Sequence, residues 1–175
     1  ELMARGLARR LLVICPANLR EQWQQALDYF FHIDAQILSR TQRRYLERDL
    51  PVGSNLMEFY PIFIVSIDYA KNPEIKSQIL EVPWDVVLID EAHQAAKPHQ
   101  SSPEQHVRMD RWDLAKAVAY SDKVKHLLLL TATPHNGYTD TFASLLRLLN
   151  VGAVEGSEYA PLIKRAVARK HVVQR

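Results

Sequence analysis

Two carboxylates and an imidazole follow an apolar run in the middle of the chain. Residues 86–93 read Val-Val-Leu-Ile-Asp-Glu-Ala-His, so Asp90, Glu91 and His93 emerge where a buried strand would end. A carboxylate in that position is costly unless a cation or a hydrogen-bond donor compensates its charge. In nucleotide triphosphatases the cation is Mg²⁺, which the carboxylate holds against phosphate oxygens. We therefore expect Asp90 to hold Mg²⁺, and Glu91 to orient the attacking water and accept its proton.

His93 lies about one turn further along, where its ring is placed to hydrogen-bond a phosphate oxygen or a neighbouring strand end. A plainer interpretation is that Asp90 and Glu91 begin a helix, since acidic residues favour the positive end of the helix dipole. That accounts for one carboxylate but not for the whole set. A zinc site is a further alternative, but His93, His99 and His106 lack the i, i+4 spacing of a helical metal motif, and Cys15 has no second cysteine beside it.

The elements that must position these residues alternate between strand and helix. Continuous apolar runs, typical of strands covered on both faces, predict strands at 11–15, 62–66, 86–89 and 127–130, with a shorter strand at 35–39. Asn18 is placed to cap the helix that follows it. Helical patterns also cover residues 1–10, 41–48, 74–80, 106–120, 139–150 and 159–170. This order predicts an α/β fold, a mostly parallel sheet with helices on both faces.

Polar residues gather at the carboxyl ends of these strands. Ligands bind at that edge of an open parallel sheet. The residues that reach it are 15–18, Ser66, 90–93 and 131–137. Their convergence on one edge predicts a binding site there.

Composition sets limits on the class of protein. Of 175 residues, 47% are hydrophobic and 24% are charged, which is ordinary for a globular domain. No apolar run is long enough to span a bilayer, and a lone cysteine in a core strand suits a reduced thiol, so we expect a cytoplasmic protein with no membrane partner. The net charge of +2 is small, and the local basic clusters fit solvated helix faces as well as a polyanion partner: Arg5, Arg9 and Arg10; Arg40, Arg43, Arg44 and Arg48; Lys164, Arg165, Arg169 and Lys170.

Four stretches of residues 10–150 resemble the motifs of superfamily II helicases and translocases, with the spelling of the Swi/Snf-type branch. That branch includes bacterial RNA-polymerase-recycling ATPases and phage-defence helicases. WDVVLIDEAH resembles motif II, the Walker B element with its DEAH box, and LLLLTATPHNG resembles motif III. LLVICPANLREQW is similar to motif Ia, and FIVSIDYAK is similar to a following segment that touches the nucleic-acid backbone.

The resemblance implies a RecA-like domain that uses ATP and Mg²⁺ and moves on nucleic acid, with double-stranded DNA as the expected partner. It assigns Asp90 to Mg²⁺ and Glu91 to water activation, and it couples His93 to motif III. In motif III, Thr131, Ala132 and Thr133 would link the nucleotide state to DNA movement. DNA phosphates would face Pro16, Ala17, Asn18, Ser66 and Tyr69. The threonines also fit a simple strand-end turn before Pro134, and Tyr69 fits a core aromatic equally well.

One element of such a motor is missing from the sequence. A phosphate loop reads G-x-x-x-x-G-K-[ST], but none of the five glycines here precedes a lysine. We expect residues 1–156 to be part of a first RecA-like domain, truncated at both ends, with residues 157–175 as a basic helical tail. A second RecA-like domain would follow in the full-length chain, and this piece alone would be inactive. The alternatives are the motor subunit of a restriction system and a degenerate helicase-like module that binds DNA or protein.

Overall fold

The computed structural model describes residues 2–98, 105–132, 139–157 and 160–173. The chain divides into two compact units. The first comprises residues Glu1–Asp90 and Ser121–Leu129, and the second comprises Glu91–Tyr120 and Leu130–Arg175. Among the described residues, no helix is both long and apolar enough to cross a membrane.

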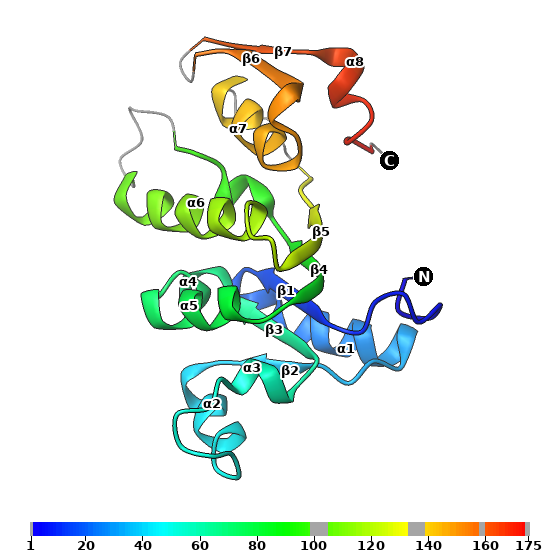
Figure 1. The fold of residues 1–175 in the computed structure, drawn as a ribbon, viewed down its shortest axis with the longest axis vertical. Coiled ribbons are helices and arrows are strands. Elements are labelled where there is room, and N and C mark those ends of the chain that lie inside the picture. Colours follow the sequence, from blue (N-terminus) through cyan, green and yellow to red (C-terminus); the bar gives the residue numbers. More distant parts are fainter. Residues whose placement is uncertain (1, 99–104, 133–138, 158–159, 174–175) are drawn as a thin grey trace. The chain divides into compact units, whose positions relative to one another are not determined.

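The first unit is built on a five-stranded sheet in the order β2-β3-β1-β4-β5 (Figure 1). All four strand pairs are parallel, as the apolar runs predicted. The register places Cys15 opposite Ser66 and Ile14 opposite Ile89, so the carboxyl ends of the three central strands meet at one edge. The strands are β1 (Leu11–Cys15), β2 (Gln36–Leu38), β3 (Ile62–Ser66), β4 (Trp84–Ile89) and β5 (Val124–Leu129).

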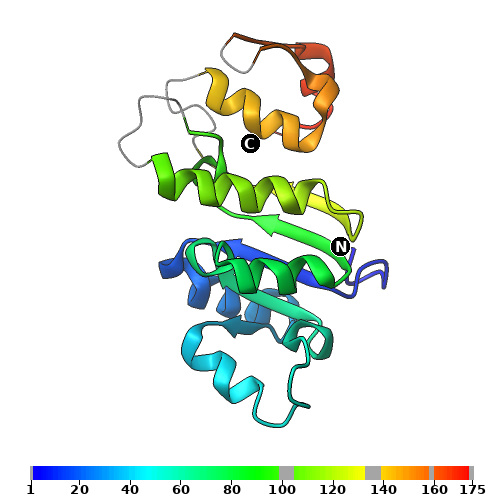
Figure 2. The ribbon, with the colours of Figure 1, turned by 60° about the vertical axis from the view of Figure 1, so that its left-hand side comes forward.

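Helices lie on both faces of this sheet. Figure 2 shows α1 and α5 on opposite sides of the strands. Successive strand residues face opposite sides, and Leu11, Val13 and Cys15 pack with Leu19, Trp23 and Leu27 beneath α1. The intervening residues Leu12 and Ile14 are fully buried on the other face. The helical elements of this unit are the 3₁₀ turn η1 (Ala17–Leu19), α1 (Arg20–Phe31), α2 (Arg40–Leu46), α3 (Leu56–Phe59), α4 (Ile67–Ala70) and α5 (Pro73–Glu81).

The second unit is mostly helical and has a small core of its own. Ala143 and Leu146 of its most amphipathic helix pack against Ala153, Val154 and Ala168. The unit contains η2 (Ala92–Ala95), α6 (Gln105–Ala119), α7 (Thr139–Leu149), η3 (Val151–Ala153), β6 (Val154–Gly156), β7 (Pro161–Ile163) and α8 (Arg165–Ala168).

Two predictions about the amino-terminal third are wrong. Residues 2–6 form turns rather than a helix, and Gly6 sits at φ 71°, a left-handed conformation that a continuing helix does not contain. Asn18 does not cap α1. The 3₁₀ turn closed by the Leu19 amide on the Pro16 carbonyl (3.0 Å) runs directly into Arg20, so Asn18 lies inside the turn instead of ahead of the helix.

The predicted tail helix over 159–170 is also wrong in its secondary structure. Residues Pro161–Ile163 form β7, antiparallel to β6, with Val154 opposite Ile163. Gly156 has φ 81°, which turns the chain away from β6, and a helix occupies only Arg165–Ala168. Pairing of the two strands therefore outweighs the local helical pattern. The domain boundary at residue 156 stays a prediction.

Candidate functional site

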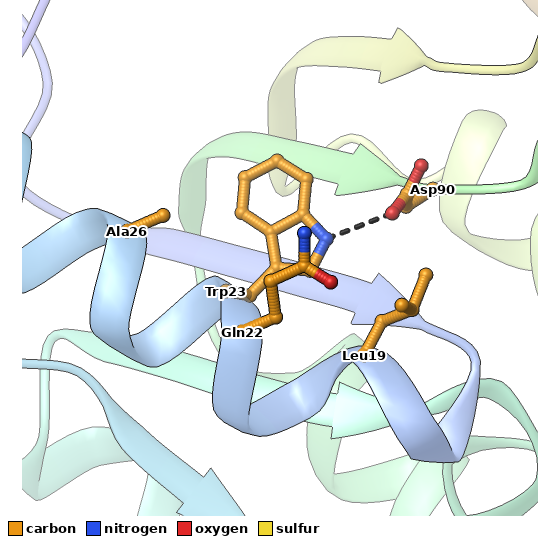
Figure 3. A pocket seen from close by; sticks show the side chains of 5 residues that line it. All are labelled: Leu19, Gln22, Trp23, Ala26 and Asp90. Atoms are coloured by element: carbon orange, nitrogen blue, oxygen red, sulfur yellow. Dashed lines mark hydrogen bonds between the residues drawn. The ribbon is translucent and has the colours of Figure 1, made fainter.

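Asp90 directly follows β4, at the carboxyl edge of the sheet. Its backbone amide donates to the Ile14 carbonyl at 2.8 Å, which extends the β1–β4 ladder by one residue. Its carboxylate Oδ2 accepts a hydrogen bond of 2.8 Å from the indole Nε1 of Trp23 on α1 (Figure 3). The strand and the helix therefore fix both the backbone and the side chain of Asp90.

The carboxylate borders an open hollow of about 220 Å³. The hollow lies along the start of α1, and Figure 3 shows the Trp23 ring and the Asp90 carboxylate, joined by their hydrogen bond, in its lining. Its lining is mainly apolar: Leu19, Gln22, Trp23, Ala26 and Asp90. A carboxylate at the rim of such a hollow is the kind of group that a cation or a further donor would compensate.

The residues present fit a magnesium ion that arrives with a nucleotide. Within the described parts of the chain, no three His, Cys, Asp or Glu side chains are grouped as a metal cage. Mg²⁺ in nucleotide sites does not need such a cage, because it is bound through one or two carboxylates together with phosphates and water. Asp90 supplies a hard oxygen ligand of this kind, and a bound Mg²⁺ would neutralise phosphate charge there.

Glu91, His93 and Thr131 form a cluster within the second unit. The Nδ1 atom of His93 lies 3.1 Å from Glu91 Oε2 and 3.1 Å from Thr131 Oγ1. The imidazole therefore contacts a carboxylate and a hydroxyl through the same ring nitrogen. The amide of Ala92 donates to the Leu130 carbonyl at 2.8 Å and so ties the same two segments together through the backbone.

Glu91 adopts a backbone conformation that is unusual for a residue with a side chain. Its φ and ψ are 48° and 47°, in the left-handed region. A non-glycine residue in this region costs on the order of 1 kcal/mol or more and is held there by its surroundings. Here the Gln94 amide bonds to the Glu91 carbonyl at 2.8 Å and the His93 ring bonds to the side chain. The turn therefore directs Glu91 and His93 toward one another.

The two segments predicted to face DNA are neighbours at the edge of the sheet. Cys15 pairs with Ser66, so the residues that follow β1 and β3 leave adjacent strands. Ala17 and Asn18 are exposed and Pro16 is half-buried. Ser66 is buried, and its Oγ caps α4 by accepting from the Tyr69 amide at 3.2 Å. The exposed loop is thus open to a ligand, whereas Ser66 has a structural role as well.

Tyr69 is half-buried and hydrogen-bonds with Arg43 of α2. Arg43 also pairs with Glu74 of α5 at 2.7 Å and with Glu47. The hydrogen bond to Glu74, with smaller contributions from Glu47 and Tyr69, raises the pKa of Arg43 above its ordinary value. Arg43 therefore joins three helices behind the predicted DNA-facing segment, and the interpretation of Tyr69 as a packed aromatic gains support.

Within the second unit the structure brings Glu91, His93 and Thr131 together, and within the first unit it places the 16–18 loop beside Ser66. His93 contacts a neighbouring strand end, Thr131, as one of its two predicted partners. Ala132 is exposed beside it, and Thr133 lies outside the described residues. Sequence reasoning missed the Trp23 contact with Asp90. The sequence contained a signal for this contact. A helix that follows a strand begins at the carboxyl edge of the sheet, which is also where Asp90 lies.

The comparison with protein families decides the relationship. The profile of the SNF2-related domain matches residues 3–159, most of the chain. The chain belongs to the SNF2-related domain family. It is similar to the "Uncharacterized ATP-dependent helicase YqhH" of Bacillus subtilis, with 34% identity over 87% of this chain and 23% of that protein. The RNA polymerase-associated protein RapA of Stutzerimonas stutzeri is 28% identical over 90% of this chain and 16% of that protein.

Solved SNF2 structures agree with the fold. The "Sulfolobus solfataricus SWI2/SNF2 ATPase core in complex with dsDNA" superposes with a TM-score of 0.62 at 23% identity, over 90% of this chain and 28% of that one. The ATPase core domain of the same organism, described without DNA, gives a TM-score of 0.59 at 21% identity. The predicted RecA-like, mostly parallel α/β fold is therefore confirmed. The chain spans between 16% and 28% of the length of these SNF2 relatives.

Proposed function

We propose that this chain is part of the motor of an ATP-dependent DNA translocase or helicase that acts in the cytoplasm. Membership of the SNF2-related family and similarity to a protein named as an ATP-dependent helicase support an ATPase. Double-stranded DNA is the proposed partner, and a solved SNF2 ATPase core with the same fold is described in complex with it. A second RecA-like domain of the full-length chain completes the proposed motor.

Within this motor, Asp90 holds Mg²⁺ with the nucleotide, and Glu91 orients the attacking water and accepts its proton. His93 orients Glu91 and links it to Thr131, from which Ala132 and Thr133 continue motif III. The DNA backbone is contacted by residues at or just after the ends of β1 and β3: Pro16, Ala17, Asn18, Ser66 and Tyr69. Polar groups and helix ends bind phosphates without reading the base sequence. The observation that carries the proposal is the position of Asp90, a carboxylate directly after the strand β4 at the carboxyl edge of the sheet, where its backbone and side chain are both hydrogen-bonded.

The decisive experiment uses the full-length protein and replaces Glu91 with Gln. The variant is expected to bind the Mg²⁺ complex of ATP like the wild type but to hydrolyse it at least about a hundredfold more slowly, because the general base is lost. Glu21→Gln, an exposed change on α1, is the matched control and is expected to retain turnover. Wild-type turnover in the Glu91 variant would remove that residue from the mechanism.

This chain by itself is proposed to be inactive. None of its glycines precedes a lysine, so it lacks the loop whose amides and lysine would hold the phosphates. Isolated chain mixed with ATP, Mg²⁺ and DNA should release no phosphate above background. DNA-stimulated turnover by the isolated chain would contradict this statement.

The same missing loop favours a second candidate function, a helicase-like module that binds DNA or protein without hydrolysing ATP. A motor subunit of a restriction system is a further alternative and would carry a nuclease in the same assembly. The residues encoded directly before Glu1 distinguish the ATP-driven motor from the binding module. A glycine-rich loop ending in Gly-Lys-Thr or Gly-Lys-Ser supports the motor, and a different sequence supports the module.

A further inference from the structure

Trp23 is the one indole whose N–H reaches a carboxylate in the described structure. Its Nε1 donates to Asp90 Oδ2 at 2.8 Å, while its ring packs with the core beneath α1 (Figure 3). By contrast, the Nε1 of the buried Trp84 donates to a backbone carbonyl, that of Ile79, at 2.9 Å. The two residues make the same type of donor contact, but only Trp23 makes it to a proposed Mg²⁺ ligand.

The chemistry of an indole suits it to orienting a metal ligand. Its N–H only donates, so it neither binds a cation nor takes up a proton. It is also uncharged, whereas a lysine or arginine at the same place would compete electrostatically with Mg²⁺. A carboxylate has about four acceptor positions, and one indole donor occupies one of them while fixing the plane of the group. Donors of this kind orient metal ligands, and their loss commonly weakens metal binding about 10- to 100-fold.

Trp23 is also connected through the backbone to the exposed loop that precedes α1. The exposed loop at Ala17 and Asn18 forms η1, which continues without a break into α1 at Arg20. Trp23 lies in the first turn of α1, and the Leu19 amide just before that helix bonds to the Pro16 carbonyl of the loop at 3.0 Å. A displacement of the loop therefore moves the indole, and through it the donor on Asp90.

We propose that Trp23 is a positioning residue that couples DNA contact at Pro16–Asn18 to the orientation of the Asp90 carboxylate, and so to the affinity for the Mg²⁺ nucleotide. The inference rests on the proposed function, because it takes the loop as the DNA contact and Asp90 as the Mg²⁺ ligand. Coupling of this type is reciprocal, so the Mg²⁺ nucleotide strengthens DNA binding by the same factor.

The test measures one number in the full-length protein. It is the factor by which saturating double-stranded DNA lowers the Kd for the Mg²⁺ complex of a non-hydrolysable ATP analogue. The wild type should show a factor of about 5 to 150, the usual range for such coupling. Trp23→Phe, which removes the donor, should reduce the factor to about one. If Trp23→Phe disturbs folding, Trp23 is replaced by 3-benzothienylalanine instead. This replacement removes only the N–H donor and keeps the shape of the ring, so it should also reduce the factor to about one.

The matched control is the same pair of replacements at Trp84, which should keep the wild-type factor because its indole serves a backbone carbonyl. Nucleotide binding measured in EDTA should not differ between the wild type and the Trp23 variants, because the effect passes through the metal ligand. A wild-type factor of about one, or an unchanged factor in the Trp23 variants, overturns the inference. If the wild type fails to bind the Mg²⁺ nucleotide under any condition, it is the proposed function that fails.

Discussion

His93 and Thr131 lie 38 positions apart in the sequence, yet His93 Nδ1 and Thr131 Oγ1 are 3.1 Å apart. The same nitrogen is 3.1 Å from the Glu91 carboxylate. The imidazole thus joins the proposed general base to Thr131 of motif III. This link gives a physical basis for communication between hydrolysis and motif III in the proposed motor.

The hydroxyl of Thr131 is the first group whose removal tests that link. In the full-length protein, Thr131→Val keeps the shape of the side chain but removes the contact with His93. A neutral hydrogen bond is worth about 1 kcal/mol, so DNA-stimulated ATP hydrolysis should fall about fivefold. Thr131→Ser retains the hydroxyl and should stay close to the wild type in the same phosphate-release measurement. Equal rates for Val and Ser would show that the hydroxyl contributes nothing.

Substitutions at Asn18 and Ser66 separate an effect on DNA affinity from an effect on the stability of the fold. Asn18 is exposed and caps no helix, so Asn18→Ala in the full-length protein should weaken DNA binding about fivefold, equally for different sequences, without lowering the melting temperature. Ser66→Ala should weaken binding and also lose about 1 kcal/mol of stability, because its Oγ caps α4. Binding is followed by fluorescence anisotropy and stability by thermal unfolding. A stable Ser66 variant, or an Asn18 variant that binds normally, would contradict the corresponding assignment.

Asp85 is expected to make the stability of the first unit depend on pH. Its carboxylate pairs with Lys125 and accepts from the amides of Arg9 (2.8 Å) and Arg10 (3.0 Å). These contacts, the Lys125 hydrogen bond above all, hold the pKa of Asp85 well below its ordinary value of 3.8. The stabilisation is therefore fully present above about pH 4 and is lost as the pH falls through the lowered pKa.

Asp85→Asn should lower the free energy of unfolding of this chain by about 2 kcal/mol at pH 7, and by clearly less at pH 2. Urea unfolding at both pH values measures the difference. Asp122→Asn, an exposed change in the turn before β5, should alter stability by about 0.5 kcal/mol or less at either pH. A loss for Asp85→Asn that is the same at pH 7 and pH 2 would rule out the ionised carboxylate as its cause.

Cys15 is predicted to be chemically inert in the folded chain. Its side chain is fully buried in β1. Burial, with a smaller contribution from the negative charge of Asp90, raises the pKa of the thiol to about 12. At pH 7.5 the thiol is therefore protonated as well as inaccessible, and iodoacetamide should label it only after unfolding in urea. Complete labelling within minutes under native conditions would show that β1 opens readily.

The sequence by itself predicted the five strands of the main sheet and their parallel arrangement, and it placed Asp90 and Ser66 at the carboxyl edge of that sheet. The reason is physical: runs such as 11–15 and 62–66 are apolar at every position, and only a sheet covered on both faces buries them completely. Asp90 and Ser66 then fall at strand ends whatever the details of packing. Local patterns at the two ends of the chain were less reliable. Residues 161–163 pair with β6 although their surroundings are helical in pattern, and residues 2–6 form turns, with Gly6 in a left-handed conformation, where a helix was predicted.

Tertiary structure alone decided the contacts that connect these residues. Trp23 packs on the inner face of α1, but only the packing of α1 against the sheet brings its N–H to Asp90. Likewise, the left-handed backbone of Glu91 and its contact with His93 depend on a turn that the residue types in the sequence do not predict. Hydrogen bonds between side chains from distant segments require a distance and an angle to be satisfied together, and residue types and their spacing along the chain contain neither.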